Sequence, residues 1–269
     1  MDTCIWRCQV QTVELRRRAC VSVLLCLGLL GACDEIIGPE TGTGGSSGGT
    51  GGTAGTPTTG DDLGVGDGSD VVTIGDSWMA NTLGTGNAIE GALDRLGTDY
   101  RHYGQQGARL LRDGFLLRVI PAIPKQFDEA LDDGADIKTV IMTGGGNDVL
   151  LESDLVEDCQ VDGPDCEERL LEIKEGLEGL WADMAAAGVR DVLYIGYSSD
   201  AGTAGSQATN VFENGVADSC AEAPLRCHVI DSTSLVLGEF QDSVHPNQAA
   251  NNRMAIAIVD KLAEVGARR

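Results

Sequence analysis

A serine follows directly on a short β-branched run in the stretch "DVVTIGDSWMANTLGTG", residues 70–86. The hydroxyl of a serine is a weak nucleophile unless a nearby base takes its proton during the attack. Three histidines could supply that base: His102, His228 and His245. His245 is the best placed, because the carboxylate of Asp242, three residues earlier, can orient its imidazole and stabilise the charged ring. The sequence therefore predicts that Ser77, His245 and Asp242 act as nucleophile, base and orienting carboxylate.

Alternating short apolar runs and longer helical patterns must position these residues. Strands are expected over residues 71–74, 99–103, 138–143, 191–197 and 228–231, and helices over residues 78–96, 124–132, 167–187, 207–217 and 246–265. Five strand-then-helix units predict a parallel sheet between layers of helices, because parallel strands need crossover connections. Ligands bind at the carboxyl ends of such strands, which is where Ser77 stands. His102 and His228 fall within predicted strands, so we expect structural roles for both.

Two further loops carry unusual residues. Residues 143–149, "TGGGNDV", end the third predicted strand, and residues 242–247, "DSVHPN", precede the last predicted helix. Together with Gly75-Asp76-Ser77, these stretches resemble the sequence blocks of the SGNH, or GDSL-type, hydrolases, and the resemblance covers residues 70–269. It implies a flavodoxin-like three-layer α/β/α sandwich with a five-stranded parallel sheet. It also implies hydrolysis of carboxylic esters through a Ser-His-Asp triad, with no metal ion and no cofactor.

The oxyanion of a tetrahedral intermediate needs hydrogen-bond donors. The backbone N–H of Ser77 is one, and the helix predicted to follow it would add its dipole. The family resemblance implies two more, the side-chain amide of Asn147 and the backbone N–H of a glycine after the second strand. The family often shows an asparagine shortly before that glycine, whereas this chain reads "RHYGQQGARLL". We choose Gly107 over Gly104 from its spacing beyond the strand end.

The two residues that flank Ser77 have different expected roles. Asp76 is expected to secure the turn through hydrogen bonds to the backbone. Most family members carry an aliphatic residue where this chain has Trp78. Trp78 either fills the core or forms a wall of the acyl pocket, and we favour the core.

The first 32 residues are typical of a secretory signal. Arg16-Arg17-Arg18 precede the apolar run of residues 21–30, which is too short to span a membrane. The following "LGAC" resembles a bacterial lipobox, which implies cleavage before Cys33 and lipid modification of Cys33; ordinary cleavage that leaves Cys33 free is the alternative. Residues 33–69 are rich in Gly, Thr and Ser and predict a disordered linker. The domain of residues 70–269 would thus be exported and anchored to a bacterial membrane, facing the periplasm or the cell surface.

Four cysteines remain in the predicted domain, in two pairs with six intervening residues each: Cys159 with Cys166, and Cys220 with Cys227. Four cysteines allow three pairings, and two equally short loops favour the local one. A zinc site is the alternative, but zinc ligands are typically separated by about two to four residues. We therefore expect two local disulfides and an oxidising compartment.

The formal net charge of −23 argues against nucleic acid and against attraction to anionic lipid headgroups. We expect a monomer that acts on a small-molecule or glycan ester, and the few aromatic residues favour a short acyl group such as acetyl. O-acyl transfer, lysophospholipase or thioesterase activity, and a non-catalytic surface binding module are the alternatives. The acidic stretch of residues 153–166 is expected to form either a disulfide-pinned rim of the cleft or a solvated loop.

Overall fold

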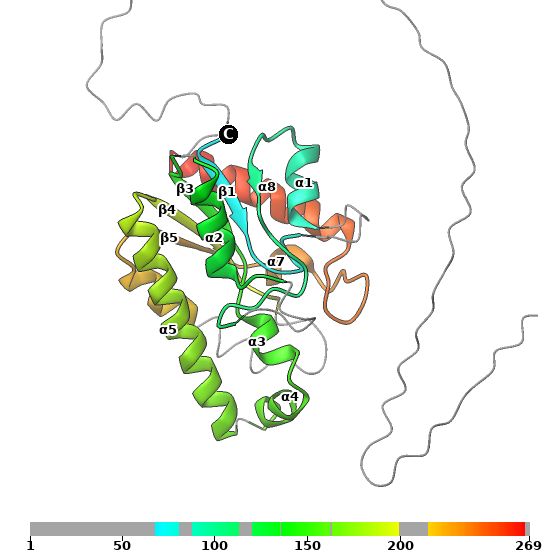
Figure 1. Cartoon of the computed structure of the whole chain (residues 1–269). Helices are drawn as coiled ribbons and strands as arrows, with labels where there is room; N and C mark the ends of the chain where they lie inside the picture. The colour runs from blue at the N-terminus through cyan, green and yellow to red at the C-terminus, as the bar shows by residue number, and fades with distance from the viewer. Residues whose placement is uncertain are drawn as a thin grey trace, which may run out of the picture. The chain divides into compact units, whose positions relative to one another are not determined.

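Five parallel strands form the central sheet of the computed structural model, in the order β2-β1-β3-β4-β5 (Figure 1). Their bounds are β1 Val71–Ile74, β2 Arg101–His102, β3 Thr139–Met142, β4 Asp191–Ile195 and β5 Arg226–Ile230. This is the strand order of flavodoxin-like sheets. Each strand overlaps a strand expected from the sequence, so the predicted fold class is confirmed.

The structure describes residues 68–80, 88–112, 120–134, 136–161, 163–198 and 215–266. All of them belong to one unit of the chain, Thr58–Arg269. The predicted signal peptide, Cys33 and the predicted linker up to residue 67 lie outside the described residues and stay predictions. Among the helices that the structure describes, none combines the length and apolar character needed to cross a membrane.

The three inner strands are buried along their whole length. β1, β3 and β4 read VVTI, TVIM and DVLYI, and each of these residues is buried. Apolar, β-branched runs of this kind suit strands that are covered on both faces. β1 lies between β2 and β3, with Val72 opposite both Arg101 and Val140. Because the strands are parallel, the segments that follow these three strands meet at one edge of the sheet.

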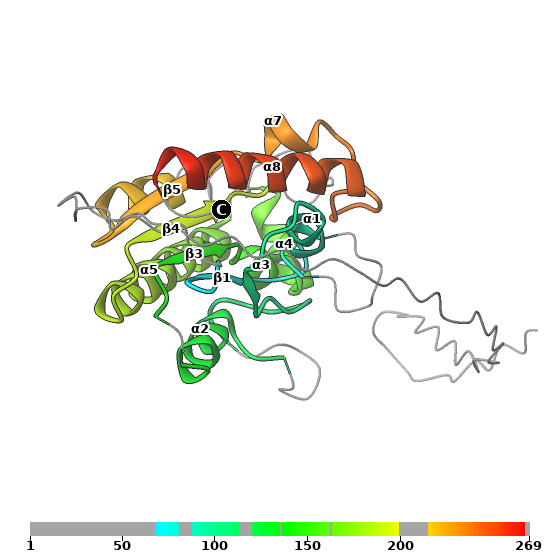
Figure 2. The ribbon, with the colours of Figure 1, turned by 90° about the horizontal axis from the view of Figure 1, so that it is seen from above.

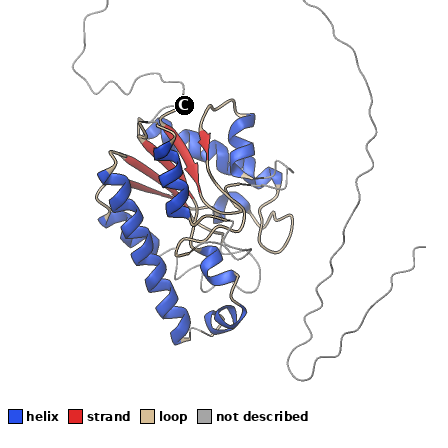
Figure 3. Ribbon diagram, viewed as in Figure 1, coloured by secondary structure: helices blue, strands red, loops and turns tan. Residues whose placement is uncertain are grey.

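Helices cover both faces of the sheet (Figures 2 and 3). Figure 2 shows α8 and α1 on one side and α2 and α5 on the other. The helix bounds are α1 Ile89–Arg95, α2 Ile123–Asp132, α3 Gly146–Leu150, α4 Ser153–Cys159, α5 Pro164–Ala186, α7 Thr233–Val236 and α8 Gln248–Glu264. Residues 215–222 are also helical. Proline stands in the first turn of α2 and α5, and the side chain of Asn247 caps α8 by accepting from the N–H of Ala250 at 3.0 Å.

The helix expected from residue 78 begins only at Ile89. Before it, the N–H groups of Met79 and Ala80 donate to the carbonyl of Asp76 at 3.1 and 2.9 Å, which closes a single turn. The carboxyl group of Asp76 also accepts from the N–H of Trp78, and such local bonds compete with helix formation. Residues 81–87 lie outside the described ranges. The expectation of a helix directly behind Ser77, with its dipole, is therefore wrong.

Three helices were not expected from the sequence. α3, α4 and α7 have five, seven and four residues, which is too short for a helical period to be recognised. The expected helix of residues 207–217 is described only from residue 215, where the chain is helical through residue 222. The acidic stretch of residues 153–166 forms α4 and the start of α5, and its role at a cleft stays a prediction.

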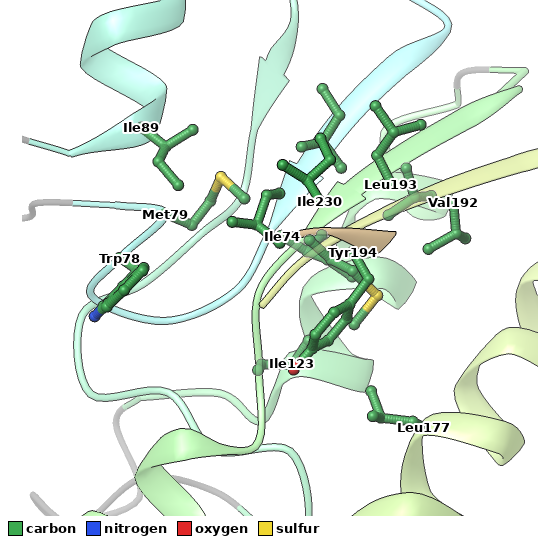
Figure 4. Packing of buried hydrophobic residues seen from close by; sticks show 14 of the residues in the cluster. Ile74, Trp78, Met79, Ile89, Ile123, Leu177, Val192, Leu193, Tyr194 and Ile230 are labelled. Carbon is green, nitrogen blue, oxygen red and sulfur yellow. The ribbon is translucent and has the colours of Figure 1, made fainter. Parts of the chain in front are cut away.

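Large apolar side chains fill the space between the sheet and the helices (Figure 4). Trp78 is 2% exposed and lies in this core, beside Met79 and Ile89 in Figure 4. This position agrees with the core role that we favoured over a wall of the acyl pocket.

Both expected disulfides are present. Cys159 bonds to Cys166 at the junction of α4 and α5. Cys220 bonds to Cys227 and so ties the helical residues 215–222 to β5. The predicted local pairing is confirmed.

Candidate active site

Ser77, His245 and Asp242 are joined in one chain of hydrogen bonds. The Oγ of Ser77 is 2.9 Å from Nε2 of His245, and Nδ1 of His245 is 2.8 Å from Oδ2 of Asp242. Both ring nitrogens are thus in use, so an imidazole that donates from Nδ1 to Asp242 accepts the serine proton at Nε2. The structure thus brings together the three residues that the sequence predicted to act together, although Ser77 and His245 are 168 positions apart.

A short loop between α7 and α8 holds the histidine and the carboxylate. Oδ1 of Asp242 accepts from the N–H of Val244 at 2.8 Å and from the N–H of His245 at 2.7 Å, and Gln241 donates back to the carbonyl of His245 at 2.9 Å. Burial raises the pKa of Asp242, but the hydrogen bonds from His245 and Val244 outweigh it, so this pKa lies below its ordinary value. The carboxylate is therefore charged at neutral pH and suited to stabilising a protonated imidazole.

Gly75 lets the chain turn sharply as it leaves β1. Its φ is +144°, and a Cβ at this position would collide with Oγ1 of Thr143, which follows β3. Gln126 of α2 binds both backbone groups of Gly75: Oε1 accepts from the N–H at 2.7 Å, and Nε2 donates to the carbonyl at 3.0 Å. These contacts determine where Ser77 emerges from the strand.

The carboxyl group of Asp76 is buried beneath the turn that carries Ser77. It accepts hydrogen bonds from the N–H of Trp78 at 3.1 Å, from the hydroxyl of Thr143 at 3.1 Å and from the hydroxyl of Tyr197. Burial raises the pKa of Asp76, and these hydrogen bonds offset the rise only in part. Burial and the neighbouring Asp76 raise the pKa of Tyr197 well above its ordinary value, so the phenol keeps its proton as a donor. The contacts of Asp76 fit the turn-securing role expected from the sequence.

Asn147, at the start of α3, is joined to the loop that follows β2. Its Nδ2 donates to the carbonyl of Ala108 at 2.9 Å. The next residue, Asp148, is fully buried and accepts from the N–H groups of Leu110 and Leu111 at 2.7 and 3.1 Å. Three hydrogen bonds therefore hold the Asn147 amide close to the segment that contains Gly107.

The two glycines after β2 differ in the use of their backbone N–H. The N–H of Gly104 donates to Oε1 of Glu90 at 3.1 Å and is already engaged. Gly107 has a φ of +80°, and among the described residues its N–H has no hydrogen-bond acceptor. The geometry thus favours Gly107 over Gly104 as a donor to a ligand.

Solved structures of the same fold align with nearly their whole length to this chain. A carbohydrate acetylesterase from Sinorhizobium meliloti has a TM-score of 0.54 at 16% identity, covering 72% of this chain and 98% of that one. An inhibitor-bound aryl esterase from M. smegmatis has a TM-score of 0.54 at 14% identity, with coverages of 72% and 98%. A member of the lipolytic G-D-S-L family from Veillonella parvula has a TM-score of 0.50 at 17% identity, with coverages of 72% and 96%. Neither a protein-family model nor a curated protein matches the chain.

This chain has the SGNH-hydrolase fold. In it, the segments after β1 and β3 and the loop before α8 carry the three sequence blocks singled out above, with Ser77, Asn147 and His245. Among the described residues of this SGNH fold, no group of three His, Cys, Asp or Glu side chains could hold a metal ion.

The other two histidines of the chain contact residues outside the candidate active site. Nδ1 of His102 is 2.8 Å from the hydroxyl of Thr73, and Nε2 is 3.0 Å from Oδ1 of Asp94. Nε2 of His228 lies 3.4 Å from Oδ1 of the buried Asp191. These contacts fit the structural roles expected for both.

Three residues that support the site were missed by sequence reasoning: Tyr197, Thr143 and Gln126. Tyr197 and Thr143 follow the ends of β4 and β3, and a position at the carboxyl edge of the sheet is the signal that could have singled them out. Gln126 lies in α2, and nothing in the sequence around it indicates a contact with Gly75.

Proposed function

We propose that the protein is a serine esterase that hydrolyses carboxylic esters, with acetyl and other short acyl esters as its substrates. The observation that carries the proposal is the hydrogen-bonded chain from Ser77 through His245 to Asp242. A nucleophile beside a base that a carboxylate orients is the arrangement of acyl-transfer enzymes. The acetylesterase and the aryl esterase of the same fold support this class of reaction.

The reaction follows from the positions of the two ring nitrogens of His245. Oγ of Ser77 attacks the ester carbonyl while Nε2 takes the serine proton, and Asp242 stabilises the imidazolium. Nε2 then gives that proton to the departing alcohol, and the acyl group stays on Oγ as an ester. In the second half-reaction Nε2 takes a proton from water as the water oxygen attacks the acyl carbonyl. Ser77 leaves with the proton, and the acid is released.

Three donors would stabilise the oxyanion in both half-reactions: the N–H of Ser77, the N–H of Gly107 and the Nδ2 of Asn147. Removal of one such donor typically lowers kcat by about 10²–10³-fold. The donors belong to segments that follow β1, β2 and β3, which are neighbours in the sheet.

Hydrolysis of p-nitrophenyl esters, from acetate to palmitate, tests the activity. We expect the wild-type protein to prefer the acetate and Ser77→Ala to lose at least about 10³-fold in kcat. Ser219→Ala is the matched control, because it removes a buried hydroxyl that binds Glu178 at 2.8 Å rather than His245. Equal rates for wild type and Ser77→Ala would refute the proposal. Ester formation on an added sugar acceptor would instead identify a transferase.

We further propose that the domain is exported and held at a bacterial membrane through a lipid on Cys33. The two disulfides of the domain support the proposal, because such bonds persist in oxidising compartments. The wild-type protein expressed in bacteria should partition into a detergent phase, and Cys33→Ser should move to the aqueous phase. Identical partitioning of the two proteins would refute lipid attachment at Cys33.

A further inference from the structure

Trp78 connects the turn that carries Ser77 to the loop that carries His245. Its indole Nε1 donates a hydrogen bond to the backbone carbonyl of Val244 at 3.1 Å, across 166 positions of the sequence. The donor belongs to the residue directly after the nucleophile, and the acceptor to the residue directly before the base.

The indole is itself held in one orientation. The N–H of Trp78 donates to Asp76 at 3.1 Å, and its carbonyl accepts from the N–H of Ile89 at 3.1 Å. The ring of Tyr197 meets the indole edge to face, with centroids 5.1 Å apart and an interplanar angle of 80°. The hydroxyl of Tyr197 also donates to Asp76, so Tyr197 and the backbone N–H of Trp78 bind the same buried carboxyl group. The position of the indole N–H therefore follows from the turn that positions Ser77.

The contact acts on the peptide unit that leads into His245. The carbonyl of Val244 and the N–H of His245 belong to the same planar unit and point in opposite directions. The carbonyl accepts from Trp78, and the N–H donates to Oδ1 of Asp242 at 2.7 Å. This unit is thus held on both sides, once by the nucleophile turn and once by the orienting carboxylate.

We propose that Trp78 is a positioning residue that holds His245 within hydrogen-bonding distance of Ser77 through the Val244 carbonyl. The inference rests on the proposed esterase function and extends it, because it assigns a role in the reaction to a core side chain. At 2% exposure, Trp78 has almost no surface with which to contact a substrate. Its effect is therefore expected on kcat rather than on KM.

Trp78→Phe tests the proposal, because it keeps an aromatic ring against Tyr197 and removes the indole N–H. Trp181→Phe is the matched control. Trp181 is fully buried, donates from Nε1 to the sulfur of Met142 at 3.4 Å and meets Tyr194 edge to face at 80°. The two substitutions remove similar volumes and equivalent donors, but only Trp78 contacts the histidine loop.

We expect Trp78→Phe to lower kcat for a p-nitrophenyl ester about five- to tenfold relative to Trp181→Phe, with KM within twofold, since one net hydrogen bond and a displaced base are lost. Amide hydrogen exchange in the folded proteins should also be faster for residues 241–247 in Trp78→Phe alone. If Trp78→Phe does not fold, 3-benzothienylalanine at position 78 replaces the N–H with sulfur in an unchanged shape and is measured in the same way.

Unchanged kcat and unchanged exchange in an active enzyme would overturn the positioning role and leave the esterase proposal intact. A wild-type protein without activity on any ester would instead overturn the esterase proposal. The exchange rates would then still decide whether Trp78 restrains the loop of His245.

Discussion

The side-chain amide of Asn147 donates to the backbone carbonyl of Ala108 at 2.9 Å, and this bond uses only one of its two amide hydrogens. Among the described residues the other hydrogen has no acceptor, and in the proposed mechanism it is donated to the oxyanion. Asn147→Asp keeps the size of the side chain but removes both donors and adds an acceptor. We expect kcat for ester hydrolysis to fall about 10²–10³-fold with little change in KM. A loss of less than threefold would show that Asn147 does not contact the oxyanion.

Asp242→Asn should show how much the orienting carboxylate contributes to the reaction when the nucleophile and the base are unchanged. The amide lacks the charge that stabilises the imidazolium, and we expect a loss of about 10³–10⁴-fold in kcat. The pKa of Asp242 is below its ordinary value, so the group stays ionised from pH 5 to 9. The two kcat values will therefore be compared at pH 8, where the wild-type carboxylate carries its full charge. A loss of less than about tenfold would contradict the assignment.

The folded state binds a proton at Glu90 over a pH range in which the unfolded chain has released it. Burial raises the pKa of this group from 4.5 to about 8, while its Oε1 accepts from Thr73 at 2.6 Å. The stabilisation from a raised carboxyl pKa is fully present when the pH is below the pKa of the group in the unfolded chain. It is lost as the pH rises to the folded pKa of about 8. The free energy of unfolding should fall by up to about 1.4 kcal/mol per pH unit over that window from this group alone.

Glu90→Gln removes the charge and keeps the acceptor. The slope of the unfolding free energy against pH, measured by urea unfolding between pH 5 and 9, should therefore be smaller by the contribution of about one proton. A remaining slope of the same sign is expected from Asp76 and Asp148, whose pKa values are also raised by burial. Glu264→Gln, at an exposed position, should leave the slope unchanged. An unaltered slope in Glu90→Gln would show that Glu90 is ionised in the folded protein.

Tyr197→Phe should destabilise the protein more than the loss of a surface hydroxyl does. It leaves the buried carboxyl group of Asp76 short of one donor, which costs about 1–3 kcal/mol. Tyr103→Phe is the control, because that hydroxyl donates to the exposed Asp133 at 2.8 Å, and we expect a cost below about 0.5 kcal/mol. Chemical denaturation of both variants provides the comparison. Equal costs would mean that Asp76 does not depend on Tyr197.

The sheet and the proximity of Ser77, His245 and Asp242 could be predicted from the sequence because both leave local signals. Apolar, β-branched runs fall on β1, β3 and β4, and Asp242 precedes His245 by a spacing that one loop can close. The prediction of a helix directly behind Ser77 was wrong because the hydrogen bonds of Asp76 favour a turn there. That carboxyl group binds Thr143 and Tyr197, which lie 67 and 121 positions away. Contacts of this range depend on how strands align, and no local pattern contains them.

Ser77, the proposed nucleophile, follows β1, the first strand along the chain, whereas His245, the proposed base, lies in a loop beyond β5, the last one. During synthesis or export with the N-terminus leading, Ser77 and its neighbouring donors emerge long before residues 242–247. In the proposed mechanism, a nascent chain therefore has the serine without its base and cannot yet hydrolyse an ester. In that mechanism the Ser77 hydroxyl becomes reactive only when the loop of residues 242–247 docks, so maturation of the fold would also control when the enzyme becomes active.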